Sequence, residues 1–204
     1  MMIRTLFLAV ALLFITGCDA MKIDDFTDTE PAFVPEEYFI GKTKAWGIFQ
    51  DRFGSVRRDF VVDINGYMDG DILVLDEDFV YSDGEIDQRT WRITKLDDDT
   101  YEGEANDIIG KAQGERRGRA MRWRYDFDLV VGGRSWQVHF DDWMLLQDEN
   151  VMVNRTTVSK WGLTIGEVYI FFMKQPEAAT GSGADEASSS RRQTAAYDAE
   201  QAAE

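Results

Sequence analysis

The sequence contains a single cysteine, Cys18, and a single histidine, His139, among its 204 residues. One cysteine excludes an intramolecular disulfide, so the folded part must be held together by its core. Zinc sites need several Cys, His or carboxylate ligands at fixed spacing, and no such spacing occurs. The sequence also has no Gly-x-Ser-x-Gly motif, the signature of one large hydrolase class. We therefore predict no catalytic residue, no metal site and no cofactor.

Basic side chains are also scarce. There are 22 Lys and Arg against 38 Asp and Glu, which gives a formal net charge of −16. Nucleic acid is excluded as a partner, because its phosphates must be neutralised by a basic patch. Electrostatic adsorption to anionic lipid headgroups is disfavoured for the same reason. Any attachment to a membrane must come from apolar groups.

Long apolar runs are absent except for Leu6–Ile15, which is shorter than the roughly 20 residues that span a bilayer. Arg4 precedes it and Thr16-Gly17-Cys18 follows it, so residues 1–17 are predicted to be a secretory signal peptide. The ending resembles a bacterial lipobox. That resemblance implies cleavage before Cys18 and acylation of Cys18, and two or more acyl chains anchor a protein stably. An ordinary secretory signal with an incidental cysteine is the alternative.

Asp19 directly follows the predicted lipid anchor. In the lipoproteins of well-studied enteric bacteria, an Asp at this position is a sorting signal that retains the protein in the inner membrane. The resemblance therefore implies the periplasmic face of the inner membrane, with the inner leaflet of the outer membrane as the alternative. The alternative stays open because Asp19 is also the first of several acids in an acidic segment.

Three further regions follow from composition. Residues 18–35 have acids, Pro31 and Pro35 but no clear periodicity, and are predicted to be a flexible lipidated tether. Residues 36–175 hold nearly all the large apolar residues and form the folded domain. Residues 176–204 are rich in Ala, Ser, Gly, Glu and Gln, and are predicted to be a disordered tail.

The folded domain shows the pattern of antiparallel strands. After a helical turn that begins at Pro35, short runs rich in aromatic and β-branched residues are separated by Gly and Asp. Apolar and polar residues alternate along 121–129 and again along 136–141, which is typical of strands between core and water. We predict an all-β, up-and-down barrel of about 8–10 strands, because closure removes exposed edges. A β-sandwich is the alternative, and we expect a monomer.

Several segments are similar to a family of proteobacterial lipoproteins known as domain of unknown function 3833. The segments are Ala45–Arg52, Leu75–Tyr81, Phe140–Met144, Asn154-Arg155 and Ser159–Gly162. The resemblance covers Tyr38–Lys174 and implies a calycin or lipocalin-like barrel able to hold an apolar ligand. The family has no established activity, so it supplies no catalytic residues.

Two groups of residues are candidates for ligand binding. Aromatic side chains that could line the barrel interior, either as a cavity wall or as a filled core, are Trp46, Trp123, Tyr125, Phe127, Trp136 and Phe140. Polar residues near predicted strand ends, expected as a salt-bridged rim or as a clamp for a ligand headgroup, are Asp141, Asp142, Asn154, Arg155 and Lys160.

Three functions remain open on the sequence. The first is a membrane-anchored lipoprotein that binds or carries an apolar ligand such as a fatty acid or lipid. The second is a non-catalytic interaction or scaffold lipoprotein whose barrel is filled. The third is a hydrolase or isomerase that uses paired carboxylates such as Asp76 and Asp78. An internal cavity of a few hundred Å³ would separate the first from the second.

The anchor prediction is tested by Cys18→Ala. Without the acylated sulfur, the protein should be unprocessed or should no longer sediment with membranes after a high-salt wash, which strips electrostatic adsorption. Wild-type protein should band with inner membranes on a density gradient. Normal processing and membrane retention of the variant would contradict the lipobox interpretation.

Overall fold

The computed structural model describes residues 21–131 and 134–176. The predicted signal peptide, Cys18 and Asp19 lie outside the described residues, as does all but the first residue of the predicted tail. In the described part of the chain, no helix is long and apolar enough to cross a membrane.

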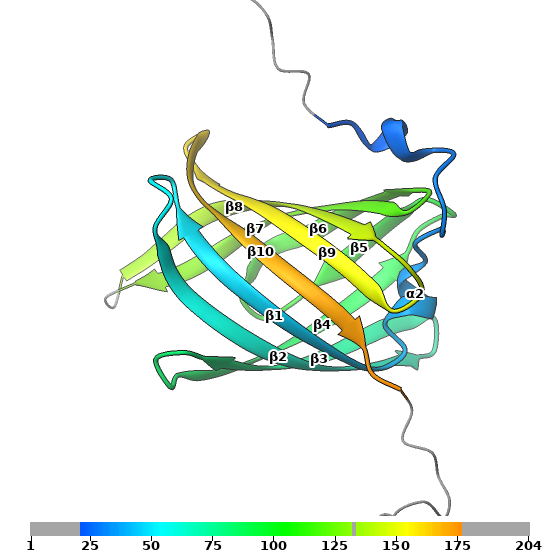
Figure 1. Cartoon of the computed structure of the whole chain (residues 1–204), viewed down its shortest axis with the longest axis horizontal. Coiled ribbons are helices and arrows are strands. Elements are labelled where there is room, and N and C mark those ends of the chain that lie inside the picture. The colour runs from blue at the N-terminus through cyan, green and yellow to red at the C-terminus, as the bar shows by residue number, and fades with distance from the viewer. Residues whose placement is uncertain (1–20, 132–133, 177–204) are drawn as a thin grey trace, which may run out of the picture. The chain divides into compact units, whose positions relative to one another are not determined.

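Ten antiparallel strands form a closed barrel in which each strand pairs with its neighbours in sequence and β1 pairs with β10 (Figure 1). The strands are β1 (Gly41–Asp51), β2 (Val56–Asp69), β3 (Ile72–Tyr81), β4 (Ile86–Lys95), β5 (Thr100–Glu104), β6 (Ile108–Arg117), β7 (Ala120–Val131), β8 (Arg134–Leu146), β9 (Val151–Lys160) and β10 (Leu163–Lys174). This confirms the predicted all-β, up-and-down barrel. Both core clusters and every strand lie within residues 21–176, so the barrel needs nothing from residues 1–20 to close.

Alternation along the strands decides which side chains enter the barrel. On β7, Met121, Trp123 and Tyr125 are buried inside, while Arg122 lies on the outer surface in an ion pair with Asp141 of β8. The large Trp123 ring fits because glycines face it, as at Gly114 of β6, where a Cβ atom would lie 2.5 Å from the ring. Small and large residues therefore complement each other across neighbouring strands.

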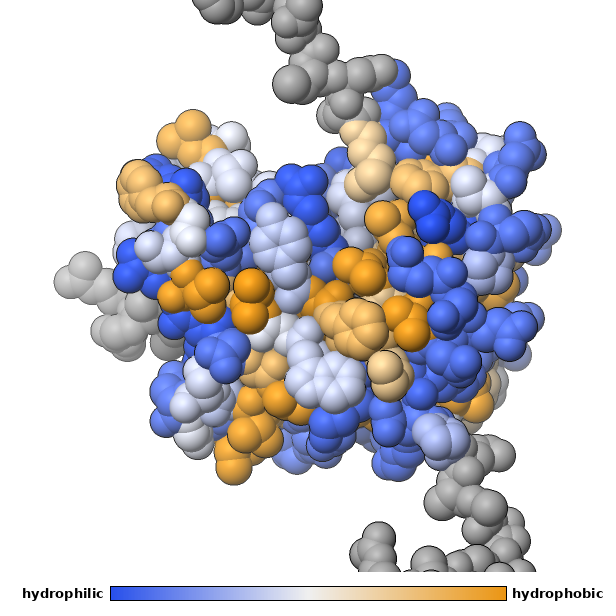
Figure 2. All heavy atoms as spheres, in the orientation of Figure 1, coloured by the Kyte–Doolittle hydropathy of each residue, from blue (hydrophilic) through white to orange (hydrophobic). Residues whose placement is uncertain are grey.

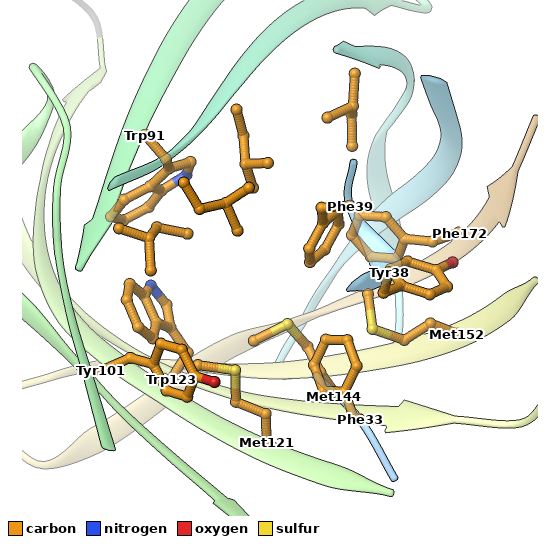
Figure 3. Packing of buried hydrophobic residues seen from close by; sticks show 14 of the residues in the cluster. Phe33, Tyr38, Phe39, Trp91, Tyr101, Met121, Trp123, Met144, Met152 and Phe172 are labelled. Atoms are coloured by element: carbon orange, nitrogen blue, oxygen red, sulfur yellow. The ribbon is translucent and has the colours of Figure 1, made fainter. Parts of the chain in front are cut away.

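One end of the barrel is closed by aromatic side chains. The predicted helical turn is present as α2 (Pro35–Tyr38), and Tyr38 packs edge-on against Phe39 with ring centroids 5.0 Å apart. Phe39 in turn contacts Phe172 of β10 at 6.2 Å, and Phe33 contacts Phe39 at the same distance. Figure 3 shows Tyr38, Phe39 and Phe172 gathered on one side of the interior, across from Trp91 and Trp123. All of these rings are buried.

The prediction of a flexible tether is wrong for residues 21–34, which we call the N-terminal strap. The strap begins with a short 3-10 helix, η2 (Ile23–Phe26), on the outside of the barrel, where Phe26 packs on Trp143 with centroids 6.2 Å apart. It then forms a backbone bond from Phe33 N–H to the Gly118 carbonyl at 2.8 Å. The many acids of this segment predict flexibility, but its two aromatic residues, Phe26 and Phe33, pack against the barrel. Their burial offsets the entropic cost of ordering the segment.

The closed end should be a major source of stability. Phe33 is fully buried, and truncating a buried Phe costs about 3–5 kcal/mol. We expect Phe33→Ala to lower the free energy of unfolding by that amount in chemical denaturation. Phe53→Ala is the matched control, because Phe53 is 77% exposed. An equal, small effect of both substitutions would show that the strap does not seal the barrel in solution.

Candidate binding cavity

The barrel encloses a cavity of about 670 Å³ that is lined mainly by apolar side chains. Its deep end is bounded by Phe39, Phe172 and Trp91, close to α2. Its other end reaches Arg57, Arg58 and other charged residues of the β1–β2 and β3–β4 hairpins, so the cavity opens there. We call this open end the mouth. A volume of this size falls in the range of small-molecule sites.

Four of the six aromatic candidates line the cavity: Trp123, Tyr125, Phe127 and Phe140. The Tyr125 and Phe140 rings stack at 5.2 Å, and the Phe127 ring lies 5.3 Å from that of Phe140. Trp91 of β4 completes this wall edge-on, 5.3 Å from Tyr125. Trp91 was not among the predicted cavity residues, although it lies two residues before Ile93 and therefore points to the same side of the strand.

The other two aromatic candidates do not line the cavity. Trp46 faces outward, 39% exposed, against Phe171 of β10. The inward positions on either side of Trp46 hold the small residues Ala45 and Gly47. The Phe60 ring fills the space at Gly47, where a Cβ atom would lie 2.3 Å from the ring. Trp136 is 41% exposed near the barrel's open end, with the Lys160 ammonium 3.8 Å above its ring.

The predicted polar rim is also wrong, because neighbouring residues of a strand point to opposite sides. Asp141 lies outside and accepts two bonds from Arg122, at 2.7 and 2.8 Å. Arg155 lies outside as well and pairs with Glu167 at 2.6 Å. Two of the predicted rim residues, Asp142 and Asn154, face the interior, and they are 7% and 3% exposed. Lys160 lies near the mouth.

A polar layer crosses the cavity between its two apolar halves. On β3, Glu77 projects inward between Leu75 and Phe79, and its partner on β4 is Arg89. Arg89 donates from Nε to Asp107 Oδ2 at 2.7 Å, and its Nη2 lies 2.6 Å from the same oxygen in an ion pair. The sequence does indicate that Glu77 points inward, because it lies two residues from Leu75 and from Phe79 and so shares their side of the strand.

Asp142 and Thr156 complete the polar layer on β8 and β9, where they pair across the strands. Burial raises the pKa of Asp142 from 3.8 to about 7. The hydroxyls of Thr156 and Tyr125 and the charge of Arg89 stabilise the carboxylate and oppose this rise in pKa. Burial likewise raises the pKa of Glu77 from 4.5 to about 7, with Arg89 opposing the rise. The cavity therefore holds two carboxyl groups that change charge near neutral pH.

The mouth carries charged side chains that are already paired. The Arg58 guanidinium lies 3.5 Å above the Tyr81 ring and contacts Asp83 at 3.1 Å. Arg57 pairs with Asp51 at 2.5 Å. His139, by contrast, lies outside the barrel with Nδ1 2.9 Å from Asp126. Among residues 21–131 and 134–176, no three His, Cys, Asp or Glu side chains are grouped as a metal site.

Residues 12–174 match the model of one protein family, described as protein of unknown function DUF3833. The chain belongs to this family. No curated protein matches this DUF3833 chain. Among solved structures it is similar to the S-type phycobiliprotein lyase CPES from Guillardia theta, at 5% identity and a TM-score of 0.53. That match covers 78% of this chain and 96% of the lyase, and it supports the barrel fold alone.

The raised pKa of Asp142 predicts how stability depends on pH. The unfolded chain ionises Asp142 near pH 3.8, whereas the folded chain holds the proton to about pH 7, so folding is weakened as pH rises between these values. Asp142→Asn removes this loss. The stability of the variant relative to wild type should therefore rise by on the order of 2 kcal/mol between about pH 5 and pH 8.

Urea denaturation at both pH values measures this difference. Asp71→Asn is the control, because Asp71 is exposed in the β2–β3 turn. A variant whose stability relative to wild type does not change with pH would show that Asp142 titrates as an ordinary, solvated carboxyl group.

Proposed function

We propose that this DUF3833 protein is a membrane-anchored lipoprotein whose barrel binds or carries an apolar ligand such as a fatty acid or another lipid. The observation that carries the proposal is the cavity of about 670 Å³, closed at α2 and open at the mouth. Protein interiors are normally packed to the density of organic crystals, and an unfilled apolar cavity of this size sacrifices many contacts. An apolar ligand would restore them.

The barrel's size explains why there is room. Eight strands give an interior just wide enough for side chains to fill it, and the diameter grows with strand number. Ten strands close this barrel, and the wall between Glu77 and the mouth carries Phe60, Phe79 and Phe127, with no plug formed there by the part of the chain that the structure describes. Such a wall favours an occupant with extended apolar surface.

The strap supports a location close to a membrane. If Cys18 is the lipid anchor, only three residue steps separate it from Met21, the first described residue, a span of at most about 11 Å. The ordered strap would then hold the barrel against the bilayer surface, with Asp19 favouring the inner membrane. A barrel held this close could exchange a lipid with the membrane over a short path.

We propose a binding rather than a catalytic role. The single histidine is exposed on the outer wall and bonded to Asp126, away from the cavity. Inside, Arg89 pairs with Asp107, and the interior carboxyl groups have no nucleophile beside them among the described lining residues other than the Thr156 and Tyr125 hydroxyls. The Tyr125 hydroxyl is a weak acid, and burial raises its pKa further.

A second candidate function, docking onto an envelope partner, is favoured by one surface. A row of apolar side chains crosses the outer face, from Val61 of β2 through Trp46 and Phe171 to Val153 of β9. Trp46, Phe171 and Val153 are each between 38% and 39% exposed. Figure 2 shows orange and pale side chains gathered on this face among blue ones. Exposed apolar patches of this kind mark interaction surfaces.

Ligand binding is tested by filling the cavity. Val62 is 3% exposed and lines the cavity, so Val62→Trp should place an indole inside it and lower the affinity for a fluorescent apolar probe, N-phenyl-1-naphthylamine, by about tenfold or more. The adjacent Val61 points outward, so Val61→Trp should bind the probe as wild type does. Equal binding by both variants would place the probe on the outer patch and favour the docking function.

A further inference from the structure

We infer that the cavity selects ligands that carry a hydrogen-bond donor, a hydroxyl or an amine, at the level of Glu77 and Asp142. This inference rests on the proposed function and narrows its ligand class. The two residues come from β3 and β8 and both line the cavity. An apolar chain that reaches past the mouth meets them before it reaches the deep end at Phe39 and Phe172.

Asp142 is the strongest evidence for a missing donor. The residue is 7% exposed, and its Oδ1 atom is buried without a hydrogen-bond partner among the described residues. The hydroxyls of Thr156 and Tyr125 act on the carboxyl group yet leave that oxygen unsatisfied. A buried acceptor without a partner costs about 1–3 kcal/mol, and more when it is charged. A donor on the ligand would recover that cost.

Glu77 extends the acceptor site across the cavity. It makes no ion pair with Arg89 within 4 Å, although the two residues are cross-strand partners, and Arg89 pairs with Asp107 instead. Asp142 lies near enough to disfavour the charge of Glu77. Two carboxyl groups therefore line the same cavity, and Asp142 Oδ1 has no hydrogen-bond partner among the described residues.

The charge balance of the layer opposes a carboxylate ligand at this depth. Three acids, Glu77, Asp107 and Asp142, surround a single cation, Arg89, whose ion pair is with Asp107. A ligand carboxylate placed there would add a like charge and bring no donor when ionised. The headgroup of a fatty acid would instead remain at the mouth, beside Arg57 and Arg58.

The selection is measured by competition. The chain without residues 1–18 retains every strand of the barrel, and N-phenyl-1-naphthylamine serves as the reporter. Three ligands with the same alkyl chain compete with it at pH 8: dodecylamine, dodecanol and dodecanoate. We expect dodecylamine and dodecanol to displace the probe at concentrations about tenfold or more below dodecanoate, the effect of one charge-assisted hydrogen bond.

Two variants show whether the layer causes the selection. Asp142→Asn and Glu77→Gln should each shrink the advantage of dodecylamine over dodecanoate by about fivefold or more. The retained affinity for the probe reports that each variant is folded. Asp78→Asn is the control, because Asp78 is the outward neighbour of Glu77 and bonds Gln88 on the surface.

The outcomes separate the two proposals. A wild-type chain that does not bind the probe overturns the proposed function. A chain that binds the probe but is displaced equally by all three ligands leaves the proposed function standing and overturns this inference. The same holds if the preference for dodecylamine survives in Asp142→Asn and Glu77→Gln.

Discussion

Closure of the ten-stranded sheet is the constraint on which the rest of the structure depends. Pairing of β1 with β10 satisfies the last free edge, and it fixes an interior that side chains alone do not fill. Once the barrel is closed, alternation assigns each residue to the cavity or to the outer surface. The aromatic wall, the polar layer and the outer apolar row are all consequences of that assignment.

Among residues 21–131 and 134–176, aromatic side chains close only one of the two ends of the barrel. Phe33 packs against Phe39, which packs against Phe172, while α2 is held by the bond from Tyr38 Oη to the Asn150 carbonyl at 3.1 Å. At the other end the hairpins carry charged pairs such as Arg58 with Glu85. A ligand of the proposed kind would therefore enter at the mouth and meet the carboxyl groups of the polar layer partway in.

Sequence reasoning recovered what periodicity encodes and missed what packing decides. Along β7, large residues alternate strongly with charged ones, so Trp123, Tyr125 and Phe127 were placed inside correctly. Along β1 the inward residues are small, and the outward Trp46 gave the stronger but misleading signal. The strap was missed because its acids dominate its composition.

The polar layer could have been found from phase alone, since Glu77 falls in step with the apolar residues beside it. Its partners could not, because the ion pair between Arg89 and Asp107 joins β4 to the β5–β6 turn. The predicted rim failed for a related reason. Residues adjacent in sequence, such as Asp141 and Asp142, lie on opposite sides of the wall.

The central claim is that the barrel interior holds an apolar ligand, and native mass spectrometry of the protein extracted gently from its own membranes tests it most directly. The account predicts a population whose mass exceeds that of the ligand-free protein by one lipid, and it predicts that Val62→Trp loses this population. A wild-type protein found only at its ligand-free mass would contradict the account.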